Sequence, residues 1–223
     1  MSIFRYHPAD DVELTLRARL ACYPRVDDIT WDGLRALFSA LARVAFRAQF
    51  RLVVSGAWPH GERIAYVANH QSHLDTIAIL SALPASQRRG LVALAAKDYF
   101  FEHLGPALGA SLFAQAVAFD RLTPLEARRW ARLIGDQPRG RLLVYPSGSR
   151  RSHRVHPGLL FILARCGWQI VPLRLEGTAA AWPVGARVWR PFRTIRVSVE
   201  APLAAAMRAR DLASELERIW EGR

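Results

Sequence analysis

From Arg51 almost to its C-terminus, the chain alternates short apolar runs with helical patterns, and this alternation restricts the folds open to it. Short apolar runs bounded by turn residues are typical of buried strands. The predicted strands lie at 51–55, 64–68, 91–95, 114–119, 141–145, 169–175 and 195–199. The predicted helices lie at 73–82, 99–108, 124–134, 157–166 and 208–221. Interleaved strands and helices indicate an α/β fold, and we expect a single domain with a mixed, largely parallel central sheet flanked by helices.

A basic amphipathic helix is expected over residues 32–51, ahead of the sheet. Its apolar side carries Leu34, Leu37, Phe38, Leu41, Val44 and Ala45. Its other side gathers Arg35, Arg43, Arg47 and Arg51. Such a helix either lies on an anionic membrane with its apolar side down, or packs on the protein's own core with its arginines in water. We therefore expect a helical segment over residues 1–50, available for membrane docking, and an α/β domain over residues 51–223.

The charge of the chain indicates an anionic partner. The formal net charge is +12 over 223 residues, and among the 31 cationic side chains only Lys97 is not arginine. Arginine holds phosphates through a planar fork, so nucleic acid, anionic lipid, a phosphorylated substrate and an acidic carrier protein are all candidates. We expect no nucleic-acid partner, because surface motifs of the RNA-binding kind, with aromatic residues interleaved with arginines, are not evident.

The two cysteines, Cys22 and Cys166, form neither a metal-binding pattern nor a disulfide scaffold, which indicates a reducing compartment. The first residues do not resemble a signal peptide, and no run of about eighteen apolar residues is free of charge. We expect a cytoplasmic protein that binds peripherally to the inner face of the cell membrane.

The segment Ala68–Asp75, with the sequence Ala-Asn-His-Gln-Ser-His-Leu-Asp, lies between two apolar runs, where a strand is followed by a helix. Such junctions often carry chemistry. On one continuous helix, His70 and Asp75 would point to different faces. If His70 ends the strand and Ser72 begins the helix, Asp75 falls in the first helical turn and reaches back to the imidazole. A carboxylate bonded to one ring nitrogen leaves the other nitrogen free to accept a proton.

Two other interpretations of this segment are open. Ser72-x-x-Asp75 is also an acidic form of a capping box, in which Asp75 serves only backbone N–H groups. His70, His73 and Asp75 are also potential metal ligands, but no fourth ligand is apparent in the sequence, so we expect no metal.

Two further polar clusters follow predicted strands. Asp120-Arg121 comes after the strand at 114–119, where a surface ion pair is the simplest interpretation. Tyr145–Arg151, with the sequence Tyr-Pro-Ser-Gly-Ser-Arg-Arg, allows backbone N–H groups and arginines to converge on an anion. This cluster has neither the spacing of a P-loop nor a Gly-x-Ser-x-Gly hydrolase motif. Active sites of α/β sheets form at the carboxyl ends of strands, where these clusters lie.

The order of the motifs resembles that of the glycerolipid acyltransferases, the PlsC-like lysophosphatidic acid (1-acylglycerol-3-phosphate) acyltransferase family. The motifs are Asn-His-x-x-x-x-Asp from Asn69, Asp-Arg from Asp120, aromatic-Pro-x-Gly-Ser-Arg from Tyr145 and Ile-Val-Pro from Ile170. The resemblance spans residues 64–178 and implies that the domain over residues 51–223 is an acyltransferase domain. It implies acyl transfer from a thioester, either acyl-CoA or acyl-carrier protein, to the hydroxyl of a lysophospholipid such as 1-acylglycerol-3-phosphate.

The resemblance also implies roles for single residues. His70 would be the general base and Asp75 its orienting partner. The residues implied in substrate binding are Arg121, Gly148, Ser149, Arg150, Val171 and Pro172. Arg121, Gly148 and Arg150 would hold the phosphate of the acceptor, whereas Val171 and Pro172 would line the acyl side. No cofactor is implied, and the expected partners are the acyl donor, the lysolipid and an anionic membrane surface.

The chain departs from the family pattern at three positions. Ser147 stands where the family usually has glutamate, Ser149 where it has threonine, and Gln115 where it has glycine. The lost glutamate removes a carboxylate from the acceptor site, so a different acceptor, such as an aminoacyl lipid or a glycolipid, is an alternative. A non-catalytic module that binds anionic lipid is a third interpretation, but such a module would need neither His70 nor Asp75.

Overall fold

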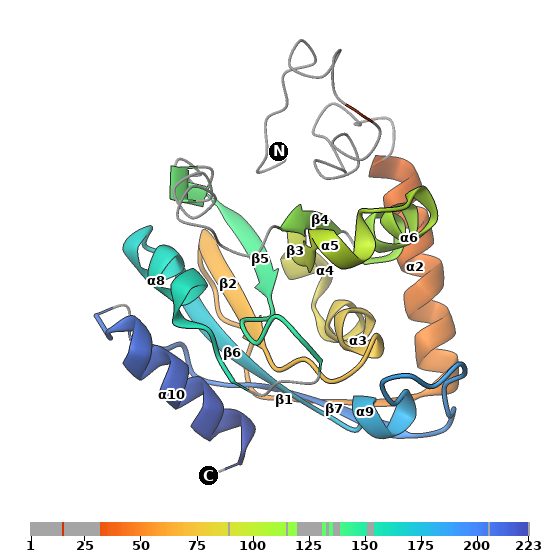
Figure 1. Cartoon of the computed structure of the whole chain (residues 1–223). Coiled ribbons are helices and arrows are strands. Elements are labelled where there is room, and N and C mark those ends of the chain that lie inside the picture. The colour runs from red at the N-terminus through yellow and green to blue at the C-terminus, as the bar shows by residue number, and fades with distance from the viewer. Residues whose placement is uncertain are drawn as a thin grey trace.

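The computed structural model describes residues 32–88, 90–114, 116–119, 139–150, 154–204 and 206–222, together with residues 15, 131, 132, 134 and 135. Within these ranges, a seven-stranded sheet in the order β1-β7-β6-β2-β5-β3-β4 lies between helices (Figure 1). The strands are β1 (Arg51–Ser55), β2 (Arg63–Ala68), β3 (Leu91–Ala96), β4 (Ala116–Phe119), β5 (Gly140–Val144), β6 (Gln169–Glu176) and β7 (Thr194–Val199). The helices are α2 (Asp32–Gln49), α3 (Leu74–Ala82), α4 (Ala85–Arg88), α5 (Lys97–Phe100), α6 (Leu104–Ala114), α8 (Pro157–Arg165), α9 (Thr178–Ala181) and α10 (Ala209–Trp220).

Neighbouring strands are parallel except β6 and β7, which are antiparallel. This arrangement confirms the predicted α/β domain with a mixed, largely parallel sheet. The central strand β2 lies between β5 and β6, and its residues from Ile64 to Ala68 are fully buried. Because a strand covered on both faces needs apolar side chains in both directions, it forms a continuous apolar run, which made β2 recognisable in the sequence. The helix predicted over 124–134 lies largely outside the described residues.

The helix predicted over 99–108 is wrong in its bounds, because α5 ends at Phe100 and α6 begins at Leu104. Pro106 explains the break. Proline has no N–H to donate and its ring clashes with the preceding turn, so it fits only the first turn of a helix. Pro106 therefore lies in the first turn of a new helix, which continues to Ala114, a residue that was expected in a strand.

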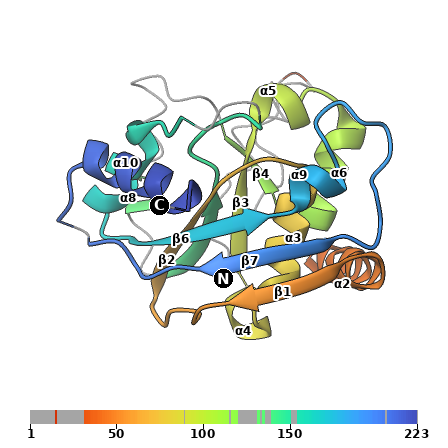
Figure 2. The same cartoon turned by 90° about the horizontal axis from the view of Figure 1, so that it is seen from below.

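Two hydrophobic cores lie on the two faces of the sheet. Tyr66, Phe46 and Leu143 belong to the core under α2, α3 and α6. Trp168 and Leu216 belong to the core under α8 and α10. Figure 2 shows these two groups of helices on opposite sides of the sheet. Since β2, β5 and β6 are parallel neighbours, the segments that follow them leave the sheet at one edge, between the two helix layers.

Helix α2 packs on the core with one side and exposes apolar residues on another. Phe46 is buried, and Phe38 contacts Phe113 of α6 at 5.5 Å between ring centroids. The exposed stripe consists of Leu34, Leu37, Leu41 and Val44, which are 44%, 53%, 54% and 68% exposed. Arg47 donates a hydrogen bond to the carbonyl of Ser81 on α3. The helix therefore docks on the protein and still leaves an apolar stripe on the surface. Within the described residues, no helix is both long and apolar enough to cross a bilayer.

Candidate active site

The loop between β2 and α3 carries His70, and Asn69 ties this loop to the neighbouring strand. Asn69 Nδ2 donates to the carbonyl of Leu175 at 2.9 Å, and Asn69 Oδ1 accepts from the N–H of Leu175 at 2.7 Å. The asparagine side chain is buried, and Leu175 lies near the carboxyl end of β6. These two bonds continue the contact between β2 and β6 past the end of β2. They fix the direction in which the chain leaves the sheet, and so they position His70.

His70 and Asp75 are in contact, as expected from their spacing. Nδ1 of His70 lies 2.8 Å from Oδ2 of Asp75. Helix α3 begins at Leu74 rather than Ser72, so Asp75 still falls in its first turn. Because a carboxylate oxygen accepts the hydrogen bond, Nδ1 of the neutral ring carries the proton, and Nε2 is the nitrogen with the free lone pair. The His70 side chain is 19% exposed and that of Asp75 is 0% exposed, so solvent reaches the ring but not the acid.

Asp75 also holds the loop that lies just ahead of α3. Its Oδ2 accepts from the backbone N–H of Gln71 at 2.6 Å and from that of Ser72 at 2.8 Å. The same oxygen atom therefore serves backbone N–H groups and contacts His70, so Asp75 does not serve backbone N–H groups alone. The other oxygen, Oδ1, is buried and receives no hydrogen bond from the described residues. Burying a carboxylate is costly unless hydrogen bonds hold it, and the donors on Oδ2 fix this one beside the imidazole.

Tyr145, the first residue after β5, stacks on the imidazole of His70. The ring centroids are 4.3 Å apart and the planes differ by 28°. The hydroxyl lies 2.9 Å from Oγ1 of Thr76. Burial and the nearby charge of Asp75 raise the pKa of Tyr145 well above 10, so this residue is a neutral phenol. The sequence placed Tyr145 in a polar cluster, and the only sign of its contact with His70 was its position after a strand.

A cavity of about 270 Å³ opens beside His70. The residues that line it are Asn69, His70, Gln71, Ser147, Glu217, Trp220 and Glu221. The last three come from the end of α10 and the residue after it, and no sequence motif pointed to them. Glu217 Oε1 accepts from the N–H of Val155 at 2.7 Å, and Trp220 Nε1 donates to the carbonyl of Leu173 at 3.0 Å. These bonds hold the C-terminal helix against the strand ends, where it closes one side of the cavity.

The turn after β5 contains three of the residues implied in substrate binding. Gly148 has a φ of +61°, and its N–H closes the turn on the carbonyl three residues earlier at 3.0 Å. Arg150 lies over the ring of Tyr99, 5.3 Å from its centroid, and donates to its hydroxyl at 3.2 Å. The turn meets the cavity through the buried Ser147, whereas Gly148, Ser149 and Arg150 adjoin it without lining it.

Val171 and Pro172, expected on the acyl side, lie in the middle of the sheet. Val171 is 0% exposed and lies opposite Tyr66, and Pro172 lies opposite Val67. Neither lines the cavity, because both sit on β6 before the strand reaches its carboxyl end. Arg121, the remaining residue implied in phosphate binding, lies outside the described residues.

His73 lies among aromatic rings. Its centroid is 6.1 Å from that of Tyr99, 6.4 Å from that of Phe100 and 5.3 Å from that of Trp182. Partial burial and the charge of Arg150 lower the pKa of His73 to about 4. In the part of the chain that the structure describes, no three His, Cys, Asp or Glu side chains gather as metal ligands would.

The chain matches known proteins in sequence and in fold. The model of the Acyltransferase family matches residues 51–176, more than half of the chain. Among solved structures, the chain is similar to the crystal structure of the 1-acyl-sn-glycerophosphate (LPA) acyltransferase, PlsC, from Thermotoga maritima. The TM-score is 0.64 at 16% sequence identity, over 90% of this chain and 82% of that chain. The matched segment includes β1 to β6 with His70, Asp75 and Tyr145. The chain therefore belongs to the Acyltransferase family.

Proposed function

We propose that this acyltransferase moves a fatty acyl group from acyl-CoA or acyl-carrier protein to the hydroxyl of a lysophospholipid such as 1-acylglycerol-3-phosphate. The observation that carries the proposal is the 2.8 Å contact between Nδ1 of His70 and Oδ2 of Asp75 at the wall of a cavity. An alcohol is a poor nucleophile until a base takes its proton, and this pair supplies a base. A lysolipid acceptor is also supported by the similar fold of a 1-acyl-sn-glycerophosphate acyltransferase.

In the proposed reaction, Nε2 of His70 takes the proton of the acceptor hydroxyl while the hydroxyl oxygen attacks the thioester carbonyl carbon. The carbonyl electron pair moves onto oxygen and gives a tetrahedral oxyanion. When this intermediate collapses, the C–S bond breaks and the leaving thiolate takes the proton from the imidazolium. Asp75 holds Nδ1–H throughout and stabilises the transient positive charge on the ring. The products are an ester and a thiol, and the reaction needs neither a cofactor nor a covalent enzyme intermediate.

The cavity favours a second candidate acceptor with the same chemistry. Its described lining includes two carboxylates, Glu217 and Glu221, and no arginine. Carboxylates repel a phosphate and attract a cationic group, so an aminoacyl lipid is the alternative acceptor. Transfer by the wild type to each acceptor offered alone separates the two candidates. Faster transfer to 1-acylglycerol-3-phosphate supports the first acceptor, and faster transfer to an aminoacyl lysolipid supports the second.

We further propose that the protein works in the cytoplasm, bound peripherally to the inner face of the cell membrane. The exposed stripe of α2, from Leu34 to Val44, supports a contact with lipid. The net charge of +12 favours an anionic surface, and it also favours an acidic acyl-carrier protein as donor.

The test is mass spectrometry of the products that the purified protein forms from mixed lysolipids in detergent micelles. The mixture contains 1-acylglycerol-3-phosphate, a neutral lysolipid and an aminoacyl lysolipid, with acyl-CoA or acylated carrier protein as donor. We expect one diacyl product and an equal amount of free thiol. A folded protein that forms no product from any pair would contradict the proposal and favour the non-catalytic lipid-binding module.

A further inference from the structure

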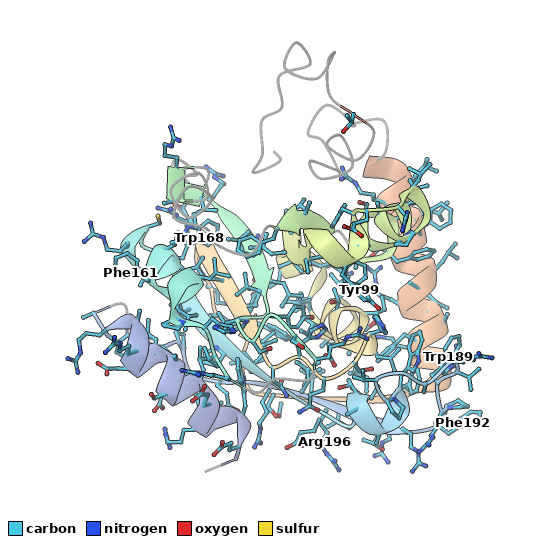
Figure 3. All side chains as sticks on the ribbon, in the orientation of Figure 1. Tyr99, Phe161, Trp168, Trp189, Phe192 and Arg196 are labelled. Atoms are coloured by element: carbon cyan, nitrogen blue, oxygen red, sulfur yellow. The ribbon has the colours of Figure 1, made fainter. Side chains whose placement is uncertain are left out.

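The segment between α9 and β7, residues 183–193, displays bulky apolar side chains to solvent. Val188 is 72% exposed, Trp189 is 43% exposed and Phe192 is 86% exposed. Figure 3 shows Trp189 and Phe192 at the edge of the molecule, beside α2. Exposed apolar groups that lie close together are typical of a contact surface. We call residues 183–193 the apolar loop.

Phe192 has a backbone conformation that a bulky residue rarely adopts. Its φ is +61°, and among the described residues it is the one non-glycine residue with a positive φ. Two hydrogen bonds to Gln49 hold the loop in this shape. The N–H of Phe192 donates to the Gln49 carbonyl at 2.6 Å, and Trp189 Nε1 donates to Gln49 Oε1. A strained backbone that displays a phenyl ring without burying it is not explained by packing, and such strain is often found at functional sites.

The charged residues of the apolar loop are all positive. Arg187, Arg190 and Arg193 are exposed, and the loop contains no aspartate or glutamate. Outside the loop, Arg196 on β7 lies opposite Glu176 on β6. Apolar side chains flanked by arginines are complementary to an anionic lipid surface. The acyl chains contact the apolar side chains, and the anionic headgroups bind the arginines. Aromatic residues and arginines do interleave here, contrary to what was expected from the sequence. However, the highly exposed Val188 offers no ring on which a base could stack, which favours lipid over nucleic acid.

We propose that the apolar loop is a membrane anchor that inserts Val188 and Phe192 between the lipids of an anionic bilayer, with Trp189 at the interface. This anchor is separate in sequence from the contact proposed for α2. Since Gln49 is the last residue of α2, the hydrogen bonds to Gln49 place the loop beside that helix. Helix and loop therefore present their apolar groups from adjoining parts of the surface.

A row of aromatic rings connects the anchor with the segment that carries His70. The ring of Trp189 lies 5.5 Å from that of Trp182, which lies 5.3 Å from that of His73. Ser72 Oγ also donates to the carbonyl of Trp182 at 2.9 Å. Insertion of the loop would bring this segment close to the bilayer from which a lysolipid acceptor would come. Only this last step rests on the proposed function, because lipid binding by the loop does not require catalysis.

The test is co-sedimentation of the full chain with vesicles of phosphatidylcholine and phosphatidylglycerol, compared with vesicles of pure phosphatidylcholine. Phe192→Asn removes the phenyl ring, and asparagine tolerates a positive φ, so this variant keeps its fold. We expect it to bind the mixed vesicles about ten- to hundredfold more weakly than the wild type, the effect of one buried phenyl ring. Arg190→Gln and Arg193→Gln should each weaken binding to mixed vesicles about fivefold and leave binding to neutral vesicles unchanged.

Phe161→Asn on α8 is the matched control. Phe161 is 55% exposed and its ring lies 5.9 Å from the guanidinium of Arg165, so it too is an exposed phenylalanine near an arginine. Figure 3 shows it at the edge opposite Phe192. We expect Phe161→Asn to bind mixed vesicles as the wild type does. The thermal unfolding of both variants verifies that each is folded.

Three results would overturn the proposal: equal vesicle binding by the wild type and Phe192→Asn, an equal loss in Phe161→Asn, or no vesicle binding by the wild type. If the wild type binds single-stranded RNA and Phe192→Asn does not, while vesicle binding is unchanged, the loop is a nucleic-acid site and the proposal is also overturned.

Acyl transfer in detergent micelles separates this inference from the proposed function. Retained transfer by Phe192→Asn with weakened vesicle binding is the expected result. No transfer by any variant, with loop-dependent vesicle binding, would contradict the proposed function and support the anchor.

Discussion

The phenol ring of Tyr145 lies against the imidazole of His70, with 4.3 Å between the ring centroids. The two residues come from the ends of β5 and β2, which are parallel neighbours. The stacking limits rotation of the imidazole, and Asp75 holds the same ring through Nδ1. Two independent contacts therefore fix the orientation of a ring that lines the cavity.

Substitutions of Tyr145 separate its ring from its hydroxyl. Tyr145→Phe loses only the contact with Thr76, so we expect acyl transfer within about fivefold of the wild-type rate, the size of one neutral hydrogen bond. Tyr145→Ala also loses the stacking, and we expect a loss of about ten- to hundredfold. Because the pKa of Tyr145 lies well above 10, the wild type and Tyr145→Phe should share one pH profile below pH 10. Steady-state rates measure both effects, and equal rates for the two variants would rule out a role for stacking.

Asp75→Asn removes the charge beside Nδ1 of His70 and leaves the ring without its orienting carboxylate. We expect kcat to fall by about a hundred- to ten-thousandfold, with KM little changed. The backbone N–H groups of Gln71 and Ser72 also lose part of their acceptor, so the free energy of unfolding should fall by about 1–3 kcal/mol. Asp211→Asn is the matched control, because Asp211 is a solvent-facing aspartate paired with Arg208 at 2.8 Å. A raised KM with unchanged kcat in Asp75→Asn would show that Asp75 only holds the loop ahead of α3 or binds substrate.

Gly177 and Gly185 have the same φ of +86° but different surroundings. A Cβ on Gly177 would lie 2.3 Å from the backbone oxygen of Thr194, whereas nothing lies within 4 Å of a Cβ on Gly185. Gly185→Ala should therefore lower the free energy of unfolding by about 1–2 kcal/mol, through its backbone conformation alone. Gly177→Ala should cost at least about 2 kcal/mol more, because the backbone of the β7 corner must move. Denaturant unfolding measures the difference. Equal losses of stability in the two variants would show that the backbone at the start of β7 moves at no cost in free energy.

Because of Tyr66, the stability of the fold depends on pH in the alkaline range. Burial raises its pKa to about 12, and its hydroxyl donates to Gln87 Oε1 at 2.7 Å. An unfolded tyrosine ionises near pH 10, so above about pH 10 the unfolded state loses a proton that the folded state keeps. The free energy of unfolding therefore falls as the pH rises from about 10 to 12. Tyr66→Phe should be less stable than the wild type near pH 8, and should lose less stability between about pH 9 and 11. Parallel stability curves for the two proteins would contradict this assignment.

The sequence was sufficient to predict those features that depend only on residues close together in the chain. Strand β2 was recognisable because a buried strand needs apolar side chains on both faces. The contact of His70 with Asp75 was predictable because it depends only on where a strand ends and a helix begins. The same local reasoning overlooked Pro106, whose position splits one predicted helix into two.

Other parts of the site depend on contacts between distant segments. Glu217 and Trp220 reach the cavity only because α10 packs against the end of the sheet, and no local pattern encodes that position. Val171 was placed on the acyl side from a motif, but the register of β6 against β2 buries it opposite Tyr66. The positive φ of Phe192 likewise follows from its bond to Gln49, a residue more than a hundred positions earlier.

The rate of acyl transfer by His70→Ala, compared with that of His60→Ala, decides whether His70 is the base. His60 is an exposed histidine outside the cavity lining, so its variant should keep the wild-type rate. We expect folded His70→Ala to lose about a hundred- to ten-thousandfold in kcat, the usual contribution of a general base. Transfer by folded His70→Ala at the wild-type rate would contradict the proposed mechanism.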